Sequence, residues 1–459
     1  MERGSCVHIE IPKRVDYILK ELQKHGYEGY AVGGCVRDAI LGREPEDWDI
    51  TTSATPEQVK QIFPRTIDTG IQHGTVTVMI NKEGFEVTTY RIDGNYVDGR
   101  HPENVEFTSD LIEDLKRRDF TINAMAYNKE QGLVDAFDGK GDLERGVIRC
   151  VGAPRERFSE DALRMLRAVR FAGQLGFEID QETKKAIMDL APTLEKISAE
   201  RIRVELDKLL CSKKPEHLLT ANELGITKVV LPEFDIMLKT SQNHPHHQYN
   251  VGIHCLQALK NVHNYKKDMD KRIFSILCWT ALLHDVGKPD TKTVDEEGIE
   301  HFYNHAQKSR ELTKKILKRL RWDNYTIDTV CHLVQYHDVT FSLKENKMRK
   351  KMSEIGVEYM PYVFLIKEAD ILAQSDYMKV EKLENLKAGK QLFEQIKNSG
   401  DCVTLKQLAV NGKLLQEHGF EKGKLLGVIL HDLLEYVMEN PKENQEEILL
   451  DYAKKKYQL

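Results

Sequence analysis

The chain lacks several features that would narrow its class at once. Its 459 residues hold eight cysteines, spread singly with no Cys-X-X-Cys pair, which argues against a disulfide framework and a cysteine-based zinc site. No apolar run approaches the roughly 20 residues that span a bilayer. The N-terminal residues 1–12 show no apolar stretch typical of a signal peptide. We therefore expect a cytoplasmic protein with no membrane partner.

An excess of charge of one sign is also missing. The 67 Lys and Arg residues face 73 Asp and Glu residues, for a net charge of -6, so the total charge does not indicate a nucleic-acid partner. One stretch, 308–321, is locally basic. Such a stretch is usually a solvated helix face and otherwise a surface for an RNA backbone.

The length predicts about three domains at roughly 150 residues each. Up to about residue 150 the sequence mixes both periodicities, with helices expected at 15–25 and 111–117 and strands at 29–32, 75–80 and 85–90. From about residue 155 apolar residues recur almost only at helical spacing. The predicted fold class is α+β, a small mixed sheet with helices followed by helical domains, with boundaries near 150, 245 and 375.

A glycine turn opens the first candidate site, in GGCVRDAILGREPEDWD at 33–49. Gly33 and Gly34 follow an apolar strand and open a helical run, so backbone N–H groups can approach a phosphate without a Cβ in the way. Arg37, one turn into the run, suits bidentate phosphate contact. The alternative is a purely structural turn.

Two carboxylates follow this turn. Asp47 and Asp49, two positions apart on an expected strand, would project to one face about 6.6 Å apart. Such a pair can hold two divalent ions that activate an attacking hydroxyl and stabilise a leaving pyrophosphate, and Trp48 would then enter the core. Glu86, in FEVTTYR, is a candidate third carboxylate. The alternatives are a solvated acidic turn and an ordinary strand residue.

A third feature, RRDFTINA at 117–124, contains Arg118, which could contact a triphosphate or cross-brace the domain. A fourth is EDALRMLRAVRF at 160–171. On a helical wheel Asp161, Arg164 and Arg167 share the arc opposite the apolar residues, and Arg170 lies on the border.

Asp161 and Arg164 match two nucleobases. A carboxylate accepts from an exocyclic amine and a guanidinium donates to a ring acceptor, as cytosine and adenine require. Uracil and guanine present the reverse pattern, at a cost of roughly 1–3 kcal/mol per unmet group. The alternative is a surface salt bridge between the two residues.

The motifs GGxVRD, DxD, FEVTTYR and RRDFTINAMAY stand in this order, and the sequence resembles the class II tRNA nucleotidyltransferase and bacterial poly(A) polymerase family. The resemblance implies a polymerase-β-like nucleotidyltransferase head at 1–150, a neck and body at 151–245 that bind base and RNA, and a tail at 376–459 that binds tRNA. It implies Mg²⁺ in the head. The implied catalytic residues are Asp47, Asp49 and Glu86, and the implied nucleotide-binding residues are Gly34, Arg37, Arg118, Asp161, Arg164, Arg167 and Arg170.

Two further segments bear on this resemblance. The segment 91–107 is rich in glycine and charge and predicts a mobile loop. In the family such a loop accompanies the change from CTP to ATP, although His101 here replaces a common arginine. Arg201 and Glu205, four residues apart in an expected helix, are expected to be a structural pair.

A second site lies at 246–375. His284 and Asp285, in WTALLHDVGKP, end an apolar helix, and with His254 and Asp370 they suit a divalent ion that activates water. The segment resembles the HD-domain phosphohydrolases, which implies a metal of undefined identity and a phosphorylated RNA end or nucleotide as substrate. It could also be a vestigial site kept for tRNA docking.

Other histidines surround this set. His305 and His337 fit the extra histidines of two-metal versions or lie at the surface, and His244, His246 and His247 are expected to form a solvated linker.

The leading hypothesis is therefore an enzyme that adds C, C and A to the tRNA 3′ end from CTP and ATP without a template. One alternative is an A-adding enzyme or poly(A) polymerase. Another, of a different class, is a metal phosphohydrolase whose head only binds nucleotide or RNA. The sequence leaves the oligomeric state open.

Overall fold

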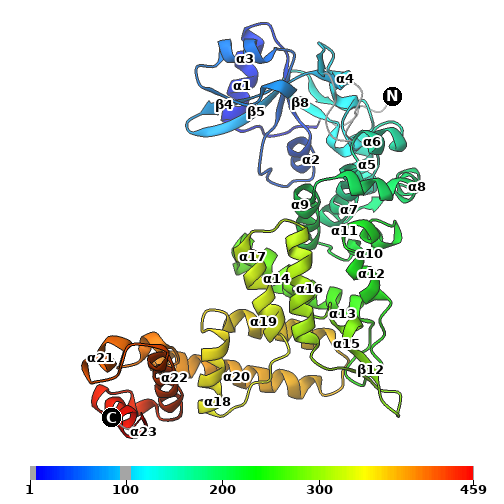
Figure 1. Ribbon diagram of the computed structural model, residues 1–459. Helices are drawn as coiled ribbons and strands as arrows, with labels where there is room; N and C mark the ends of the chain where they lie inside the picture. The colour runs from blue at the N-terminus through cyan, green and yellow to red at the C-terminus, as the bar shows by residue number, and fades with distance from the viewer. Residues whose placement is uncertain (1–6, 94–104, 458–459) are drawn as a thin grey trace. The chain divides into compact units, whose positions relative to one another are not determined.

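The computed structural model describes residues 7–93 and 105–457 and shows two compact units, Met1–Pro232 and Glu233–Leu459. A mixed sheet with helices lies in the first unit and helices dominate the second (Figure 1), so the expected α+β class is confirmed. Within the described residues, every helix is too short or too polar to span a membrane. The finer division at about 150, 245 and 375 stays a prediction.

The sheet of the first unit has the strand order β3-β4-β5-β2-β1-β8-β9. β2 and β5 run parallel and the other neighbours run antiparallel. The central strands β1 and β2 are buried at every residue, as expected for strands covered on both faces. The strands are β1 (Gly29–Val32), β2 (Ile50–Thr52), β3 (Thr66–Gly70), β4 (Thr75–Ile80), β5 (Glu83–Thr89), β8 (Ala126–Asn128) and β9 (Gly132–Val134).

Helix α1 (Lys13–Lys24) shows how the sequence covers this sheet. Val15, Ile18, Leu19 and Leu22 recur at helical spacing and are buried, and the helix packs on β1. The other helices of the unit are α2 (Gly34–Ile40), α3 (Pro56–Ile62), α4 (Leu111–Lys116), α5 (Gly139–Arg145), α6 (Pro154–Glu160), α7 (Leu163–Leu175), α8 (Gln181–Leu190), α9 (Ala199–Leu210), α10 (His217–Glu223) and α11 (Thr227–Val230). Short strand pairs join β6 (Arg91–Asp93) to β7 (Val105–Phe107) and β10 (Val147–Ile148) to β11 (Glu178–Ile179).

The second unit is built around α14, which is buried from Phe274 to Leu283. A helix apolar on all sides must be covered on all sides, and α13, α17 and α19 pack against it. The helices are α12 (Pro232–Leu238), α13 (Val251–Val262), α14 (Lys271–Leu283), α15 (Lys288–Thr291), α16 (His305–Arg319), α17 (Asn324–Tyr336), α18 (Glu345–Ile355), α19 (Met360–Ala373), α20 (Lys379–Ser399), α21 (Gly412–Glu417), α22 (Lys424–Glu439) and α23 (Glu446–Tyr457). The strands β12 (Lys292–Val294) and β13 (Glu300–Phe302) form a hairpin.

The expected elements of the first unit are present. The strands expected at 29–32 and 75–80 are β1 and β4, and the helices expected at 15–25 and 111–117 are α1 and α4 with slightly different ends. Most of the predicted mobile loop, residues 94–104, lies outside the described residues, and its flanks pair as β6 and β7.

Candidate functional site

The glycine turn of the first unit links β1 to α2. Gly33 has φ 81° and ψ -130°, a conformation that L side chains rarely adopt. A Cβ on this residue would also stand 3.0 Å from Arg118 Nη1. Glycine is therefore required here, and the turn brings the start of α2 against the Arg118 guanidinium.

The predicted carboxylates lie next to this turn. Asp47 and Asp49 are exposed and precede β2, so they do not lie within a strand as expected. The carbonyl of Asp49 accepts from the backbone N–H of Val32 at 3.0 Å. The parallel register of β2 and β5 pairs Ile50 with the residue after Glu86, which sets Asp49 beside Glu86.

The electrostatics confirm that these groups share one neighbourhood. The pKa of Asp49 is raised, first by loss of solvent around its carboxylate and then by the charge of Glu86, while Arg118 opposes the shift. Among the described residues, the sets of three metal-ligand side chains within 4.8 Å of one another lie in the second unit.

The expected core position of Trp48 is wrong. The ring is only half-buried, because the residue lies in irregular chain ahead of β2 and does not follow strand alternation.

Arg37 and Arg118 both lie beside the glycine turn but differ in their partners. Arg37 is buried, donating to Asn123 Oδ1 at 2.7 Å and to both oxygens of Asp38. Arg118 approaches Asp114 at 3.8 Å, its Nε is buried without a hydrogen-bond partner, and burial lowers its pKa. Arg118 therefore keeps hydrogen-bonding capacity that Arg37 has largely used.

The helix expected to carry the base-reading residues is broken. α6 ends at Glu160 and α7 begins at Leu163, and Asp161 between them has an extended backbone at φ -145° and ψ 103°. Its carboxylate accepts from Arg201 Nη2 at 2.7 Å and Nη1 at 3.2 Å. The prediction that one continuous helix contains Asp161 together with Arg164 and Arg167 is therefore wrong.

Arg164 also has its own partners. It donates to Glu160 at 2.6 Å and to the carbonyls of Arg157 and Arg117 at 3.2 and 3.1 Å. The alternative of a salt bridge between Asp161 and Arg164 is therefore wrong.

The other two arginines of α7 pair with acidic residues. Arg167 donates twice to Asp119, and Arg170 donates to Glu205 at 2.7 Å with its guanidinium 3.6 Å from the Phe171 ring centre. Glu205 therefore pairs with an arginine of α7. The prediction that Arg201 and Glu205 pair with each other is wrong, because Arg201 pairs with Asp161.

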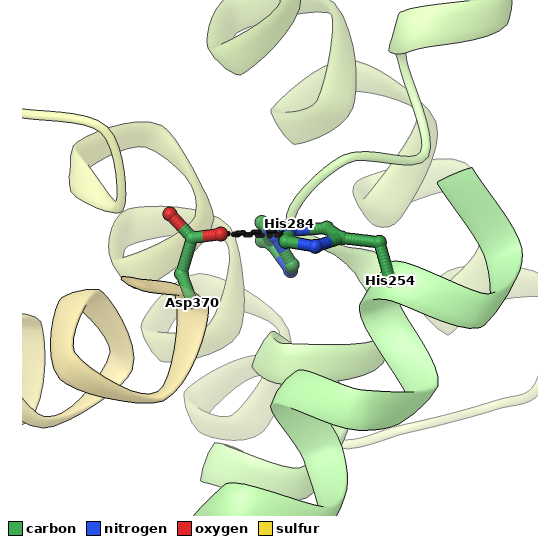
Figure 2. Close-up of side chains that lie close together, drawn as sticks. All are labelled: His254, His284 and Asp370. Atoms are coloured by element: carbon green, nitrogen blue, oxygen red, sulfur yellow. Dashed lines mark hydrogen bonds and ion pairs between the residues drawn. The ribbon is translucent and has the colours of Figure 1, made fainter. Parts of the chain in front are cut away.

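The second site is a set of six side chains, of which all but the half-buried His305 are buried, and we name it the HD cluster: His254, His284, Asp285, His305, His337 and Asp370. His254 on α13 and His284 at the end of α14 face Asp370 on α19 (Figure 2). The Nε2 atoms of the two rings lie 2.8 and 3.6 Å from Asp370 Oδ1 and 3.3 Å from each other.

Asp285 joins a second set of ligands to the first. Its Oδ2 lies 3.4 Å from His284 Nε2, and its Oδ1 lies 3.3 and 3.4 Å from His305 Nε2 and His337 Nε2. His337 is buried and His305 half-buried, so the alternative that both lie at the surface is wrong.

Three of these histidines are oriented by the backbone. Nδ1 of His284, His305 and His337 lies 2.7, 2.9 and 2.6 Å from the carbonyl three residues earlier. A carbonyl only accepts, so Nδ1 carries a proton, and Nε2 is the nitrogen that faces the cluster, where a neutral ring would offer its lone pair to a metal.

These residues fit a divalent cation. Asp285 Oδ1 is buried without a hydrogen-bond partner, as an oxygen reserved for a metal would be. Burial alone would lower the pKa of His284, but the charge of Asp285 outweighs it and raises that pKa well above its ordinary value. A cation would supply the positive charge that a proton supplies otherwise.

A cavity of about 720 Å³, which we name the HD cavity, opens from Asp285, His305, His337 and Asp370. His244, His246 and His247 lie in the irregular chain expected of a linker, but all three are half-buried and line this cavity, so the linker is less solvated than expected. The linker is short and passes directly over the cluster, where His247 meets the His254 ring at 5.5 Å.

Two residues at these sites were not predicted from the sequence. Asp119 stands in RRDFTINA beside Arg118, and its place next to two arginines was the available signal. Lys382, in a helix of alternating Lys and Glu, gave no signal, because only the fold brings it to the HD cavity.

Three family models match the chain. They are the poly A polymerase head domain at residues 29–149, the probable RNA and SrmB- binding site of polymerase A at 176–238, and the HD domain at 251–375. The two candidate sites fall within the first and third of these segments, and Asp161 and Arg164 fall between the first and second.

Relatives and solved structures agree with these matches. A CCA-adding enzyme of Ligilactobacillus salivarius is 35% identical over 442 residues, which cover 95% of each chain. One of Lactiplantibacillus plantarum is 54% identical over 203 residues, 44% of this chain and 50% of that protein. The crystal structure of the Bacillus stearothermophilus CCA-adding enzyme in complex with CTP is similar with a TM-score of 0.70 at 29% identity, covering 98% of each chain.

Proposed function

The chain belongs to the family of CCA-adding enzymes, and we propose that it adds C, C and A in turn to the 3′ end of tRNA from CTP and ATP, without a nucleic-acid template. The observation that carries the proposal is the neighbourhood of Asp49, Glu86 and Arg118 beside the glycine turn. It unites carboxylates for cations with a guanidinium for phosphate in one neighbourhood.

In the proposed reaction Asp47 and Asp49 would hold divalent cations, for which we propose Mg²⁺. When bound, such ions activate the attacking 3′-hydroxyl and neutralise the leaving pyrophosphate. The chain itself keeps both carboxylates exposed beside the turn and adds the charge of Glu86 next to Asp49. Arg118 would bind the triphosphate through its remaining N–H groups, and Arg37 would hold α2 in place through Asn123.

Base selection is assigned to Asp161 and Arg164. In the structure these groups bind Arg201 and Glu160, so each would exchange a protein partner for a base edge. Cytosine and adenine both offer an exocyclic amine beside a ring acceptor, which suits this pair. Arg167 and Arg170 would fix α7 through Asp119 and Glu205.

The test offers the purified protein and Mg²⁺ three tRNA transcripts, ending before CCA, at C and at CC, with each nucleotide triphosphate alone and with CTP and ATP together. Two C additions followed by one A, with UTP and GTP refused, would support the proposal. A alone on the CC-ended transcript would indicate an A-adding enzyme, and long A tails would indicate a poly(A) polymerase.

Binding of tRNA needs a surface that meets the phosphate backbone. In α16, Arg310, Lys314, Lys315 and Lys318 are exposed, whereas Arg319 pairs with Glu233. We propose that these four residues of the basic stretch 308–321 contact the tRNA backbone, in addition to the helical tail at 376–459.

The HD cluster supports a second proposed activity, hydrolysis of a phosphate ester at a phosphorylated RNA end or nucleotide. The observation that favours it is the two ligand sets joined by Asp285, whose Oδ2 faces His284 and whose Oδ1 faces His305 and His337. When bound there, a divalent metal activates water. Asp47→Ala is expected to abolish nucleotide addition and keep hydrolysis, and His284→Ala is expected to do the reverse.

A further inference from the structure

The walls of the HD cavity extend beyond the segment that matches the HD domain. That match covers 251–375, whereas His244, His246 and His247 precede it and Lys382 follows it, and all four line the cavity. The cavity therefore contains a part that the HD-domain match does not cover, contributed by the linker before it and by α20 after it.

Lys382 is the cation of this added part. Its Nζ donates to Gln374 Oε1 at 2.6 Å and to His246 Nδ1 at 2.9 Å. Both acceptors are uncharged, because a glutamine is neutral and an ammonium can only donate, so the Nδ1 that accepts from Lys382 carries no proton. An ammonium group that donates to neutral acceptors in a half-buried site is stabilised when an anion binds beside it.

Lys288, another lysine that lines the HD cavity besides Lys367 and Lys382, is already paired. Its Nζ lies 2.6 Å from Asp285 Oδ2 and donates to Gln242 at 2.7 Å. Burial lowers the pKa of Lys382, consistent with a cation that has no carboxylate in contact. Of Lys288 and Lys382, Lys382 is the one available to a ligand.

A single side chain connects Lys382 to the cluster. Gln374 donates through Nε2 to Asp370 Oδ2 at 3.1 Å and accepts from Lys382 through Oε1. The ammonium is thus held one amide away from a metal-ligand carboxylate. This arrangement suits a phosphate ester that is attacked at phosphorus beside the HD cluster while one of its non-bridging oxygens faces Lys382.

We propose that Lys382, positioned by Gln374 and His246, binds a non-bridging oxygen of the substrate phosphate in the HD cavity, so that α20 belongs to the hydrolase site. The inference rests on the phosphohydrolase activity proposed above and specifies the anion contact of that site. It also gives the linker histidine His246 a role in orienting the cation.

The test uses three variants of the full chain. Lys382→Met removes the charge and keeps most of the stem, Lys382→Arg restores a cation, and Lys390→Met changes an exposed lysine of α20 that does not line the cavity. Inorganic phosphate is titrated into the Mn²⁺-loaded proteins by calorimetry. Lys382→Met is expected to weaken phosphate binding at least tenfold, with the other two variants within twofold of the wild type.

A kinetic measurement separates this inference from the activity on which it rests. With bis(p-nitrophenyl) phosphate and Mn²⁺, Lys382→Met is expected to raise KM about tenfold with kcat and Mn²⁺ affinity nearly unchanged. Phosphate affinity and KM equal to those of Lys390→Met would overturn the anion contact while hydrolysis stands. A wild type that binds no phosphate would overturn it too. Phosphate binding that depends on Lys382 without any hydrolysis would refute the hydrolase and leave the anion contact.

Discussion

Asp119 and Arg167, 48 residues apart, form an ion pair in which Arg167 Nε and Nη2 donate to the same oxygen, Oδ2, at 2.8 and 2.6 Å. The other oxygen of Asp119 accepts from Asn123 at 3.1 Å, and Asn123 in turn accepts from Arg37 at 2.7 Å. A chain of hydrogen bonds thus runs from α7 to α2, beside the glycine turn and Asp49.

Asp119→Asn is expected to lower the free energy of unfolding by about 3 kcal/mol, because it removes the nearest counter-charge of the mostly buried Arg167 guanidinium and leaves only Glu205, at 3.7 Å. Urea denaturation followed by circular dichroism measures the change. The control Asp68→Asn affects an exposed pair with Lys60 and is expected to cost less than about 1 kcal/mol. Equal losses of stability in Asp119→Asn and Asp68→Asn would contradict the proposed contribution of the ion pair between Asp119 and Arg167.

The same pair predicts a pH dependence. Burial raises the pKa of Asp119, but Arg167 and Arg164 outweigh it, so the pKa lies below the ordinary value. A carboxyl with a depressed folded pKa contributes stability that is complete above its unfolded pKa of about 3.9 and is lost as pH falls toward the folded pKa. The stability gap between wild type and Asp119→Asn should therefore be constant from pH 6 to 8 and shrink below about pH 4. A stability gap that widens as the pH falls below 4 would contradict a lowered pKa of Asp119 in the folded protein.

The carboxylates of the head are expected to carry nucleotide addition. Asp47→Ala and Asp49→Ala should each reduce addition to tRNA by at least about 1,000-fold, because each removes a cation ligand worth several kcal/mol in the transition state. Glu86→Gln should reduce it less. Glu83→Gln, at the exposed start of the same strand, is the control and should be neutral. Single-nucleotide resolution of the products gives the rates, and normal addition by Asp49→Ala would exclude the proposed site.

Asp161→Asn is expected to relax base selection. The asparagine amide presents a donor as well as an acceptor, so it can also bind the ring N–H and carbonyl pattern of uracil. The discrimination of CTP from UTP should fall about 10- to 100-fold, because one unmet hydrogen-bonding group costs about 1–3 kcal/mol. Arg201→Met should shift selection less, since Arg201 contacts Asp161 and no base in the proposal. Glu182→Gln on the exposed face of α8 is the control. Misincorporation of UTP is the measurement, and unchanged selectivity in Asp161→Asn would assign base reading elsewhere.

Metal binding to the HD cluster should stabilise the second unit. Mn²⁺ at 100 times its Kd adds about 2.7 kcal/mol by mass action, seen as a higher Tm in calorimetry and reversed by a chelator. His284→Ala should remove this shift, and His431→Ala, an exposed histidine of α22, should keep it. A shift that survives in His284→Ala would place the metal elsewhere.

Motifs whose residues are close in sequence could be predicted from it. The Gly33 turn, the carboxylates after it, and the His284-Asp285 pair at the end of an apolar helix all follow from local pattern. The pairing of Asp161 with Arg201 could not be predicted, because it depends on a break between α6 and α7 that the uninterrupted helical spacing concealed.

Partners that lie far apart in the sequence could likewise not be predicted from it. Lys382 reaches Gln374 and His246 only because α20 follows α19 past the HD cavity. Alternating Lys and Glu in a helix is equally typical of a solvated face, so composition could not identify the one lysine that faces inward.

The Nδ1 contacts of His284, His305 and His337 with carbonyls three residues away mean that each ring is oriented by its own short stretch of backbone. The rings therefore need no rotation or chain movement when an ion arrives, and the change required of His284 is the loss of the Nε2 proton. The speed of metal capture should then be set by this proton loss, by passage through the cavity and by the shedding of coordinated water, so ions with labile hydration shells should load fastest.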